Sequence, residues 1–269
     1  MTESPTTGQA EPSGRAAPWF DQDGWRWRFD WGPNGLRRLA PLVDVVVVVD
    51  VLRFTTAVDV AVARGAVVLP YRWNDGGAAA YAAEHDALLA SKAVGPTAAS
   101  PWSLSPVSLS AIPPGTRLVL PSPNGSALCF GATEAGATAV LAGCLRNASA
   151  VARVADELAG PDGAVAVIAA GERWNGATGP LRPALEDLLG AGAILAAAAD
   201  AEGLSPEARG ARAAFADAAP DLGSVLGACG SGVELLARGM GGDLPWAADH
   251  DASSSAPRLV GDHFVDAAG

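Results

Sequence analysis

The hydrophobic positions of this chain form short continuous runs, and the clearest is the five valines at 45–49. Consecutive β-branched residues with no polar alternation are typical of a strand that is buried on both faces, as in the middle of a parallel sheet. The pattern therefore predicts a central strand of an α/β fold at this position.

The chain becomes polar directly after the valines, at Asp50 and Arg53. Apolar residues resume over 57–63, Gly65 ends that segment, and 66–69 is again apolar. This order predicts strand, polar loop, helix and strand. In open α/β sheets, ligands bind beyond the carboxyl ends of the strands, so the acid and the arginine are candidates for a site.

Similar patterns recur along the chain and place the other elements. We expect an edge strand within 19–31 and a largely parallel or mixed sheet overall. The remaining expectations are a turn at 32–35, helices at 36–42, 78–89, 127–135, 148–159 and 181–189, a break at 190–192, strands at 117–120, 138–141 and 164–169, an irregular stretch at 93–115, further helices to 238, and an irregular tail after 249 with a short strand near 259–260.

Polar loops follow three of the predicted strands. They contain Asp50 with Arg53, Asn124 with Ser126, and Glu172 with Arg173. Right-handed crossovers place such loops at one end of a sheet, so we expect the three pairs to meet in one crevice. Shared βαβ architecture explains the recurrence without a gene duplication.

The composition limits the possible partners. The 269 residues are 49% hydrophobic and 17% charged, with a net charge of −11, which argues against nucleic acid and anionic membranes. No apolar run reaches the roughly 18 residues of a transmembrane helix. Residues 1–18 read as a disordered lead-in and not a signal peptide, and the three separated cysteines read as reduced, so we expect a cytoplasmic protein. Residues 19–262 would form one α/β domain or two similar subdomains, followed by a tail at 263–269.

Asp50 and Arg53 are the leading candidates for chemistry. A carboxylate after a fully apolar strand is costly unless it is paired, hydrogen-bonded or bound to a metal, and a helix cap or an ion pair with Arg53 is the structural alternative. The arginine offers a planar fork for phosphate or carboxylate. Thr55 and Thr56 can bind an anion at the helix start, although capping explains them equally simply.

Several residues beyond these fit an anion site that contains a metal. Asn124, Gly125 and Ser126 form a short turn at a predicted helix start, without a Walker sequence. Arg146 adds a cation, and Asn147 either caps a helix or contacts the ligand. Glu186 and Asp187 are adjacent on a predicted helix; they are either a solvated or capping pair or ligands of a hard cation such as magnesium.

Several stretches together resemble the 2-phosphosulfolactate phosphatases. The similarity covers about residues 40 to 260 and is carried, in order, by residues 47–56, 63–66, 121–126, 143–152, 185–194 and 231–235, with Gly239 and Asp243.

The resemblance implies a three-layer α/β/α fold and Mg2+-dependent hydrolysis of a phosphate monoester, 2-phosphosulfolactate, to 3-sulfolactate on the route to coenzyme M. It implies catalytic roles for Asp50 and Arg53, and metal ligation by Asp50 and by Glu186 or Asp187. It implies substrate binding by Thr55, Thr56, Asn124, Gly125, Ser126, Arg146 and Asn147. Glu172 and Arg173 stand where the chain departs from the family's pattern, and we expect them to add a metal ligand and a substrate contact from the other side of the crevice. The expected partner is a small anionic phosphoester, and a homodimer is a further option.

The family's acidic pattern between its second and third strands is replaced in this chain by residues 90–95 and 99–106. A non-hydrolytic descendant that binds a small anion is therefore the alternative function. A third hypothesis is an interaction protein that uses the tryptophan-rich N-terminal segment.

Overall fold

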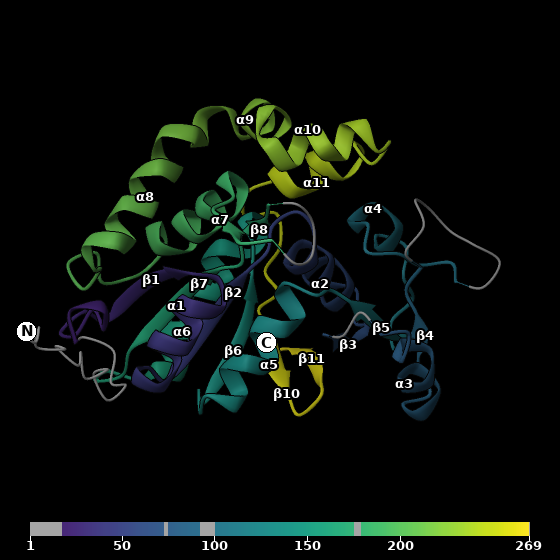
Figure 1. The fold of residues 1–269 in the computed structure, drawn as a ribbon, viewed down its shortest axis with the longest axis horizontal. Helices are drawn as coiled ribbons and strands as arrows, with labels where there is room; N and C mark the ends of the chain where they lie inside the picture. Colours follow the sequence, from purple (N-terminus) through teal and green to yellow (C-terminus); the bar gives the residue numbers. More distant parts are fainter. Residues whose placement is uncertain (1–17, 73–74, 92–99, 175–178, 269) are drawn as a thin grey trace, which may run out of the picture.

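The structure is a computed structural model that describes residues 18–72, 75–91, 100–174 and 179–268. Of the predicted lead-in at 1–18, residues 1–17 lie outside the described residues, and Pro18 begins a short 3-10 turn. Figure 1 shows a central sheet with helices on both sides. The α/β prediction is confirmed, as are the three layers that the resemblance implies.

Strands and helices alternate along most of the chain. The strands are β1 (Trp27–Trp31), β2 (Val45–Val49), β3 (Val67–Tyr71), β4 (Leu88–Leu89), β5 (Arg117–Pro121), β6 (Ala139–Gly143), β7 (Val165–Ala169), β8 (Glu172–Arg173), β9 (Leu181–Arg182), β10 (Pro257–Val260) and β11 (His263–Asp266). The helices are α1 (Gly32–Leu39), α2 (Phe54–Ala63), α3 (Ala78–Glu84), α4 (Pro106–Leu109), α5 (Gly125–Glu134), α6 (Ala148–Ala159), α7 (Leu185–Ala196), α8 (Pro206–Ala218), α9 (Leu222–Ala228), α10 (Gly230–Ala237) and α11 (Asp243–Ala248), with short 3-10 turns at Pro18–Phe20, Ala40–Leu42, Leu145–Asn147 and Ala219–Asp221.

The valine strand lies inside the sheet, between β7 and β6, and pairs with both in parallel. Its alternate side chains face two different cores. Val45, Val47 and Val49 pack in the core that includes residues of α6, α7 and α8, whereas Val46 and Val48 pack in the core that includes residues of α1, α2 and α5. Burial on both faces explains why the segment has no polar alternation.

The sheet has the order β1-β7-β2-β6-β10-β11-β3-β5-β4. Three consecutive antiparallel pairings, β6 with β10, β10 with β11 and β11 with β3, lie between the two parallel halves. Strands β3, β5 and β4 therefore run opposite to β1, β7, β2 and β6. Two similar units, β2-α2-β3 and β5-α5-β6, each connect one half of the sheet to the other.

The C-terminal residues differ most from the expectation of an irregular tail. Strands β10 and β11 form a hairpin that lies between β6 and β3 in the strand order of the sheet. The hairpin is drawn in yellow near the bottom of Figure 1. Phe264 on β11 is fully buried and packs edge-on against Phe54, with ring centroids 6.3 Å apart. The short strand expected near 259–260 is confirmed as β10, whereas β11 was expected to belong to the tail, because a four-residue strand lacks a periodic signal long enough to read from sequence.

Four other local expectations were also wrong. Helix α1 begins at Gly32, where we expected a turn, since Pro33 is well tolerated in a first helical turn. The predicted helix at 78–89 ends at Glu84, and Leu88–Leu89 pairs with β5 instead. Residues 181–182 form β9 and not the start of a helix.

Helix α7 continues through Gly190 and Gly192 without the predicted break. A Cβ on Gly190 would lie 2.5 Å from Val51, and one on Gly192 would lie 2.2 Å from the carbonyl of Ala211. These glycines allow α7 to approach β2 and α8 closely, so tertiary packing overrides their low helix propensity. No helix in the described part of the chain has both the length and the apolar character needed to cross a bilayer.

Candidate active site

Asp50 lies where helices α2 and α5 both begin. One carboxylate oxygen accepts a hydrogen bond from the backbone N–H of Phe54 (3.3 Å), and the other accepts one from Gly125 (3.1 Å) and lies 3.5 Å from the hydroxyl of Ser122. The first turn of a helix has unpaired N–H groups and a partial positive charge, so two helix starts together stabilise this carboxylate. The loops after β2 and β5 thus meet, although the two strands run in opposite directions.

Three further carboxylates surround Asp50. Glu186 and Asp187 are almost fully buried on the first turn of α7, and Glu172 is partly buried on β8. Burial raises the pKa of Asp50 to about 6, and Glu186 adds repulsion. Burial, with repulsion from Asp50 and Glu186, raises the pKa of Glu172 to about 7. The site therefore concentrates negative charge in a volume with little water, which a bound cation would relieve.

Asp187 serves mainly to hold two loops together. Its two oxygens accept hydrogen bonds from the backbone N–H groups of Val51 (2.8 Å) and Gly171 (2.8 Å), which follow β2 and β7. Burial, with repulsion from Asp50 and Glu186, also raises its pKa above the usual range. Both oxygens of Asp187 accept hydrogen bonds of 2.8 Å, shorter than the 3.1 and 3.3 Å bonds that Asp50 accepts. Asp187 is therefore less available to a metal than Asp50 or its neighbour Glu186, whose described contact is the thiol of Cys229 (3.5 Å).

The start of α5 brings neutral donors to the same place. The side-chain amide of Asn124 donates to Glu172 (3.4 Å), which connects the second and third predicted loops. Gly125 fits because a Cβ there would lie 2.2 Å from the ring of Phe54. The hydroxyl of Ser126 is fully buried and has no hydrogen-bond partner among the described residues, which is unusual for a buried polar group.

Arg53 immediately precedes α2 and extends away from Asp50 toward α11. Its guanidinium forms an ion pair with Asp243 (2.9 Å), a nearly buried residue at the start of α11. The hydroxyl of Ser105 donates to the other oxygen of Asp243. One N–H group of Arg53 is therefore engaged, and its side chain remains 18% exposed at the edge of the site.

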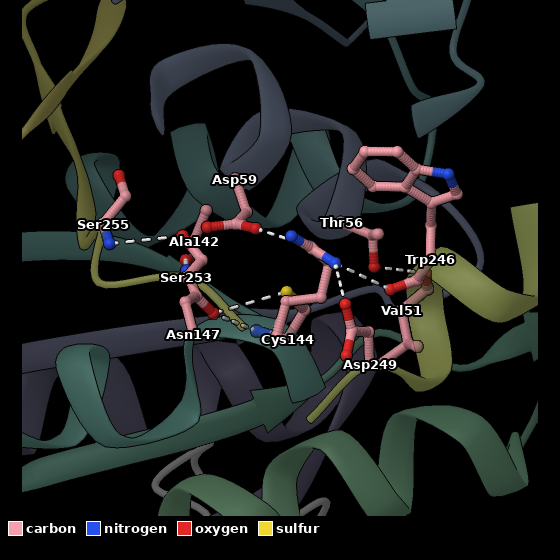
Figure 2. A network of polar contacts seen from close by, with 11 residues as sticks. Val51, Thr56, Asp59, Ala142, Cys144, Asn147, Trp246, Asp249, Ser253 and Ser255 are labelled. Carbon is pink, nitrogen blue, oxygen red and sulfur yellow. Dashed lines mark hydrogen bonds and ion pairs between the residues drawn. The ribbon is translucent and has the colours of Figure 1, made fainter. Parts of the chain in front are cut away.

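Arg146 and Asn147 belong to an internal network and not to the rim of this site (Figure 2). The guanidinium of Arg146 pairs with the fully buried Asp59 on α2 (3.0 Å) and with Asp249 (3.4 Å), and it donates to the carbonyl of Trp246 (3.2 Å). The side chain of Asn147 accepts from the backbone N–H of Cys144 (2.9 Å) and is fully buried. Both side chains thus hold the loop after β6 in place.

The two threonines also bond internally. Thr55 donates to the carbonyl of Asp50 (2.9 Å) and accepts from its N–H (3.0 Å), and Thr56 donates to the carbonyl of Val51 (2.7 Å). Both are fully buried. Their hydroxyls shape the turn between β2 and α2, and this local role matches the structural alternative for them.

The donor set suits a hard divalent cation in its chemistry. Asp50, Glu172 and Glu186 supply carboxylate oxygens, and Asn124 supplies an amide. Within the described residues, however, no three His, Cys, Asp or Glu side chains are arranged so that they could hold a metal by themselves. Mg2+ usually takes one or two protein carboxylates and completes its shell with water and substrate phosphate, so this set fits such a site.

Comparison with known proteins decides the family. Residues 35–262 match the family model described as 2-phosphosulpholactate phosphatase. The chain belongs to this family. It is also 32% identical over 222 residues to a Thermus thermophilus protein named "Probable 2-phosphosulfolactate phosphatase", an alignment that covers 81% of this chain and 89% of that protein. Membership of a phosphatase family supports an enzyme that hydrolyses phosphate monoesters.

Sequence reasoning missed several residues at the site of this phosphatase-family chain. Arg182 is paired across the β8–β9 hairpin with Glu172, donates to Ser231 (3.1 Å), and lies over the ring of Trp174. Neighbouring residues on a strand point to opposite faces, so Arg182, and not the expected Arg173, is the cation beside Glu172. Arg173 instead donates to the carbonyl of Gly179 (3.1 Å).

Ser122 and the pair Asp59–Arg146 were missed for different reasons. Ser122 has no signal of its own, because a serine after a strand is common. Asp59 did carry one, since an acid inside the apolar run 57–63 requires a partner when it is buried.

Proposed function

We propose that this chain is a Mg2+-dependent phosphatase that hydrolyses a small acidic phosphate monoester, with 2-phosphosulfolactate as the first substrate to test. The observation that carries the proposal is the arrangement at the start of α5. A helix N-terminus and an unpaired buried hydroxyl, which favour an anion, lie beside mutually repelling carboxylates, which favour a cation. A phosphate group together with a divalent cation satisfies both.

Within this proposal each side chain has a distinct task. Asp50 and Glu186 would hold the metal, with Glu172 nearby, and Asp187 would keep the loops after β2 and β7 together. A metal bound there would neutralise phosphoryl oxygens and lower the pKa of a bound water. The N–H groups of Ser126 and Ala127, in the first turn of α5, and the Ser126 hydroxyl would bind the phosphate.

Arg53 would orient the substrate from the edge of the site. Its remaining N–H groups can contact an acceptor on the phosphate or on the attached alcohol, and its planar fork makes that contact directional. Glu172 has a pKa of about 7, so it can exchange a proton near neutral pH. These roles require no side chain beyond those that the structure brings together.

Phosphate release from a panel of phosphomonoesters, with and without Mg2+, tests the proposal. We expect Mg2+-dependent turnover that Asp50→Asn reduces by more than roughly 100-fold, because the loss of an outer-shell partner alone costs 10- to 100-fold in comparable sites. Asp162→Asn, in an exposed turn before β7, is the matched control and should retain activity. Phosphate binding without turnover of any ester would instead support the non-hydrolytic alternative.

A further inference from the structure

A cavity of about 380 Å³ lies at the outer edge of the sheet, and none of its described lining residues belongs to the site around Asp50. It is bounded by the turn at Pro18–Phe20, by β1, and by helices α7 and α8. The open edge of β1 is already bonded there, because the side chain of Gln22 donates to the carbonyl of Phe29 (2.8 Å) and accepts from its N–H (3.1 Å). A further strand therefore cannot pair with β1 at this point, whereas a small molecule fits, since ligand pockets typically begin at roughly 300 Å³.

Four aromatic side chains line the cavity, two from the turn and two from β1. Their rings form two edge-to-face pairs, Trp19 with Phe20 (centroids 6.1 Å apart) and Phe29 with Trp31 (5.5 Å apart). Trp19 is 75% exposed and Phe20 is 59% exposed, so their rings leave apolar surface uncovered. The face of such a ring attracts a cation that lies within about 6 Å of its centroid, and it also covers an apolar body.

The charged groups of this cavity are both acidic. Asp30 and Glu207 are the ionisable residues among those described in its lining, and Asp30 accepts a hydrogen bond from the N–H of Trp31 (2.7 Å). Burial raises the pKa of Asp30, and the charge of Glu207 raises it further. Arg209, on the same helix as Glu207, lies instead over the ring of Trp25, 5.0 Å from the centroid. A positively charged ligand would relieve the repulsion between the two carboxylates.

This combination of rings and carboxylates excludes several classes of ligand. An anion would meet the repulsion of both carboxylates. A bare divalent cation prefers oxygen ligands and keeps much of its water, so aromatic rings offer it little. A neutral apolar molecule would take water from the Asp30 carboxylate without replacing it. An organic cation suits both the rings and the carboxylates.

We propose that this cavity is a second binding site, which takes a small organic cation: an amine or quaternary ammonium group attached to an alkyl or aryl body. The carboxylates of Asp30 and Glu207 compensate its charge, and the four rings cover its apolar surface. The site is independent of the proposed phosphatase chemistry, because it uses none of the residues assigned to the metal or the phosphate.

Choline and its uncharged carbon isostere, in which a tert-butyl group replaces the trimethylammonium group, test the role of charge. An NMR titration of the full chain should show that choline binds at least about tenfold more tightly than the isostere. Trp19→Ala should weaken choline binding about two- to fivefold, as expected for an exposed contact between a cation and a ring, and Glu207→Gln should weaken it by a similar factor. The matched controls are Trp174→Ala and Glu202→Gln, which alter an exposed ring and an exposed carboxylate outside the cavity and should leave the affinity unchanged.

Two competing locations for the cation give different results. Asp50→Asn should leave choline binding unchanged, and a loss of affinity in that variant would place the cation among the carboxylates of the phosphate site and overturn the inference. Mg2+ at the same concentration should not displace choline, since displacement would indicate a metal site. Equal binding of choline and its isostere, or equal binding of choline by Trp19→Ala, Glu207→Gln and the unaltered protein, would also overturn the inference.

Discussion

Replacing Arg146 by methionine should destabilise the fold by about 3–5 kcal/mol, because it leaves the carboxylate of Asp59 buried without its cation. Asp59 is fully buried on α2 and Arg146 is 7% exposed, so little water reaches either group. The same change removes the stacking of the guanidinium on Trp246, where the distance to the ring centroid is 5.0 Å. The network in Figure 2 therefore joins α2 to the loop after β6 and to the C-terminal end of α11.

Urea unfolding followed by tryptophan fluorescence measures this loss. The double variant Asp59→Leu/Arg146→Met should recover most of it, since well-packed apolar residues often replace a buried ion pair at little cost. Arg153→Met is the matched control on α6, where the pair with Glu157 is more than half exposed, and it should change stability by less than about 1 kcal/mol.

The difference in unfolding free energy between the unaltered protein and Arg146→Met should also depend on pH. Burial raises the pKa of Asp59 to about 6, and Arg146 opposes that shift, so the variant should have a still higher value. A carboxyl whose folded-state pKa is raised destabilises the fold progressively as the pH rises from its unfolded-state pKa to its folded-state pKa. Up to about pH 6 the unaltered protein and the variant lose this contribution equally, and above it only the variant continues to lose stability, toward its own higher pKa. The stability difference should therefore be smallest and nearly constant from about pH 4 to about pH 6 and grow as the pH rises above about 6.

A loss of unfolding free energy below about 1 kcal/mol in Arg146→Met, or a double variant no more stable than Arg146→Met, would refute the structural role of the Asp59–Arg146 pair. The Michaelis constant gives a separate check under conditions where the variant is folded. A structural Arg146 leaves it nearly unchanged, whereas a tenfold rise would restore the substrate-binding role that the sequence suggested.

Other parts of the site lead to three shorter predictions. Mg2+ should raise the unfolding temperature more at about pH 8 than at about pH 5. Burial raises the pKa of Asp50 to about 6, so this ligand must lose its proton before it binds the metal, and the neighbouring Glu172, with a pKa raised to about 7, adds attraction once it is ionised; an equal shift at both pH values would contradict this. Gly125→Ala should destabilise by about 1–3 kcal/mol and abolish activity, because its Cβ meets Phe54 and Asp50, whereas Gly131→Ala on the same helix should be tolerated in urea unfolding and in phosphate release. Asp187→Asn should lower the free energy of unfolding by about 1–3 kcal/mol, because an amide cannot accept hydrogen bonds from both Val51 and Gly171. An unchanged midpoint of urea unfolding would argue against the role of Asp187 in joining the loops after β2 and β7.

The outcome at individual residues shows where sequence reasoning succeeds. A run of five valines has one low-energy environment, a strand covered on both faces, so β2 and the loop after it were predictable. The meeting of Asp50 with Asn124 and Glu172 followed from their positions after strands. The sheet is mixed, one of the two expected options, but the reason for the meeting was only partly right, because it assumed that the strands run in the same direction, whereas β2 and β5 run in opposite directions.

The same reasoning could not separate site residues from internal ones. Thr55, Arg146 and Asn147 follow strands as Asp50 does, yet their side chains turn inward. Arg146 does so because Asp59, 87 residues earlier, needs a cation. The sequence indicates that Asp59 needs a partner when it is buried, but only the packing of α2 against the loop after β6 makes Arg146 that partner.

The pattern of apolar and polar residues was sufficient for the fold class, the central strand and the loop that carries Asp50, because burial of short apolar runs is a local and strong constraint. Which polar side chains face the site depended on contacts between distant segments. So did the placement of the last two strands in the middle of the sheet. Hydrogen bonds and ion pairs between distant segments contribute no periodicity to the chain, and they exist only once the sheet has brought their partners together.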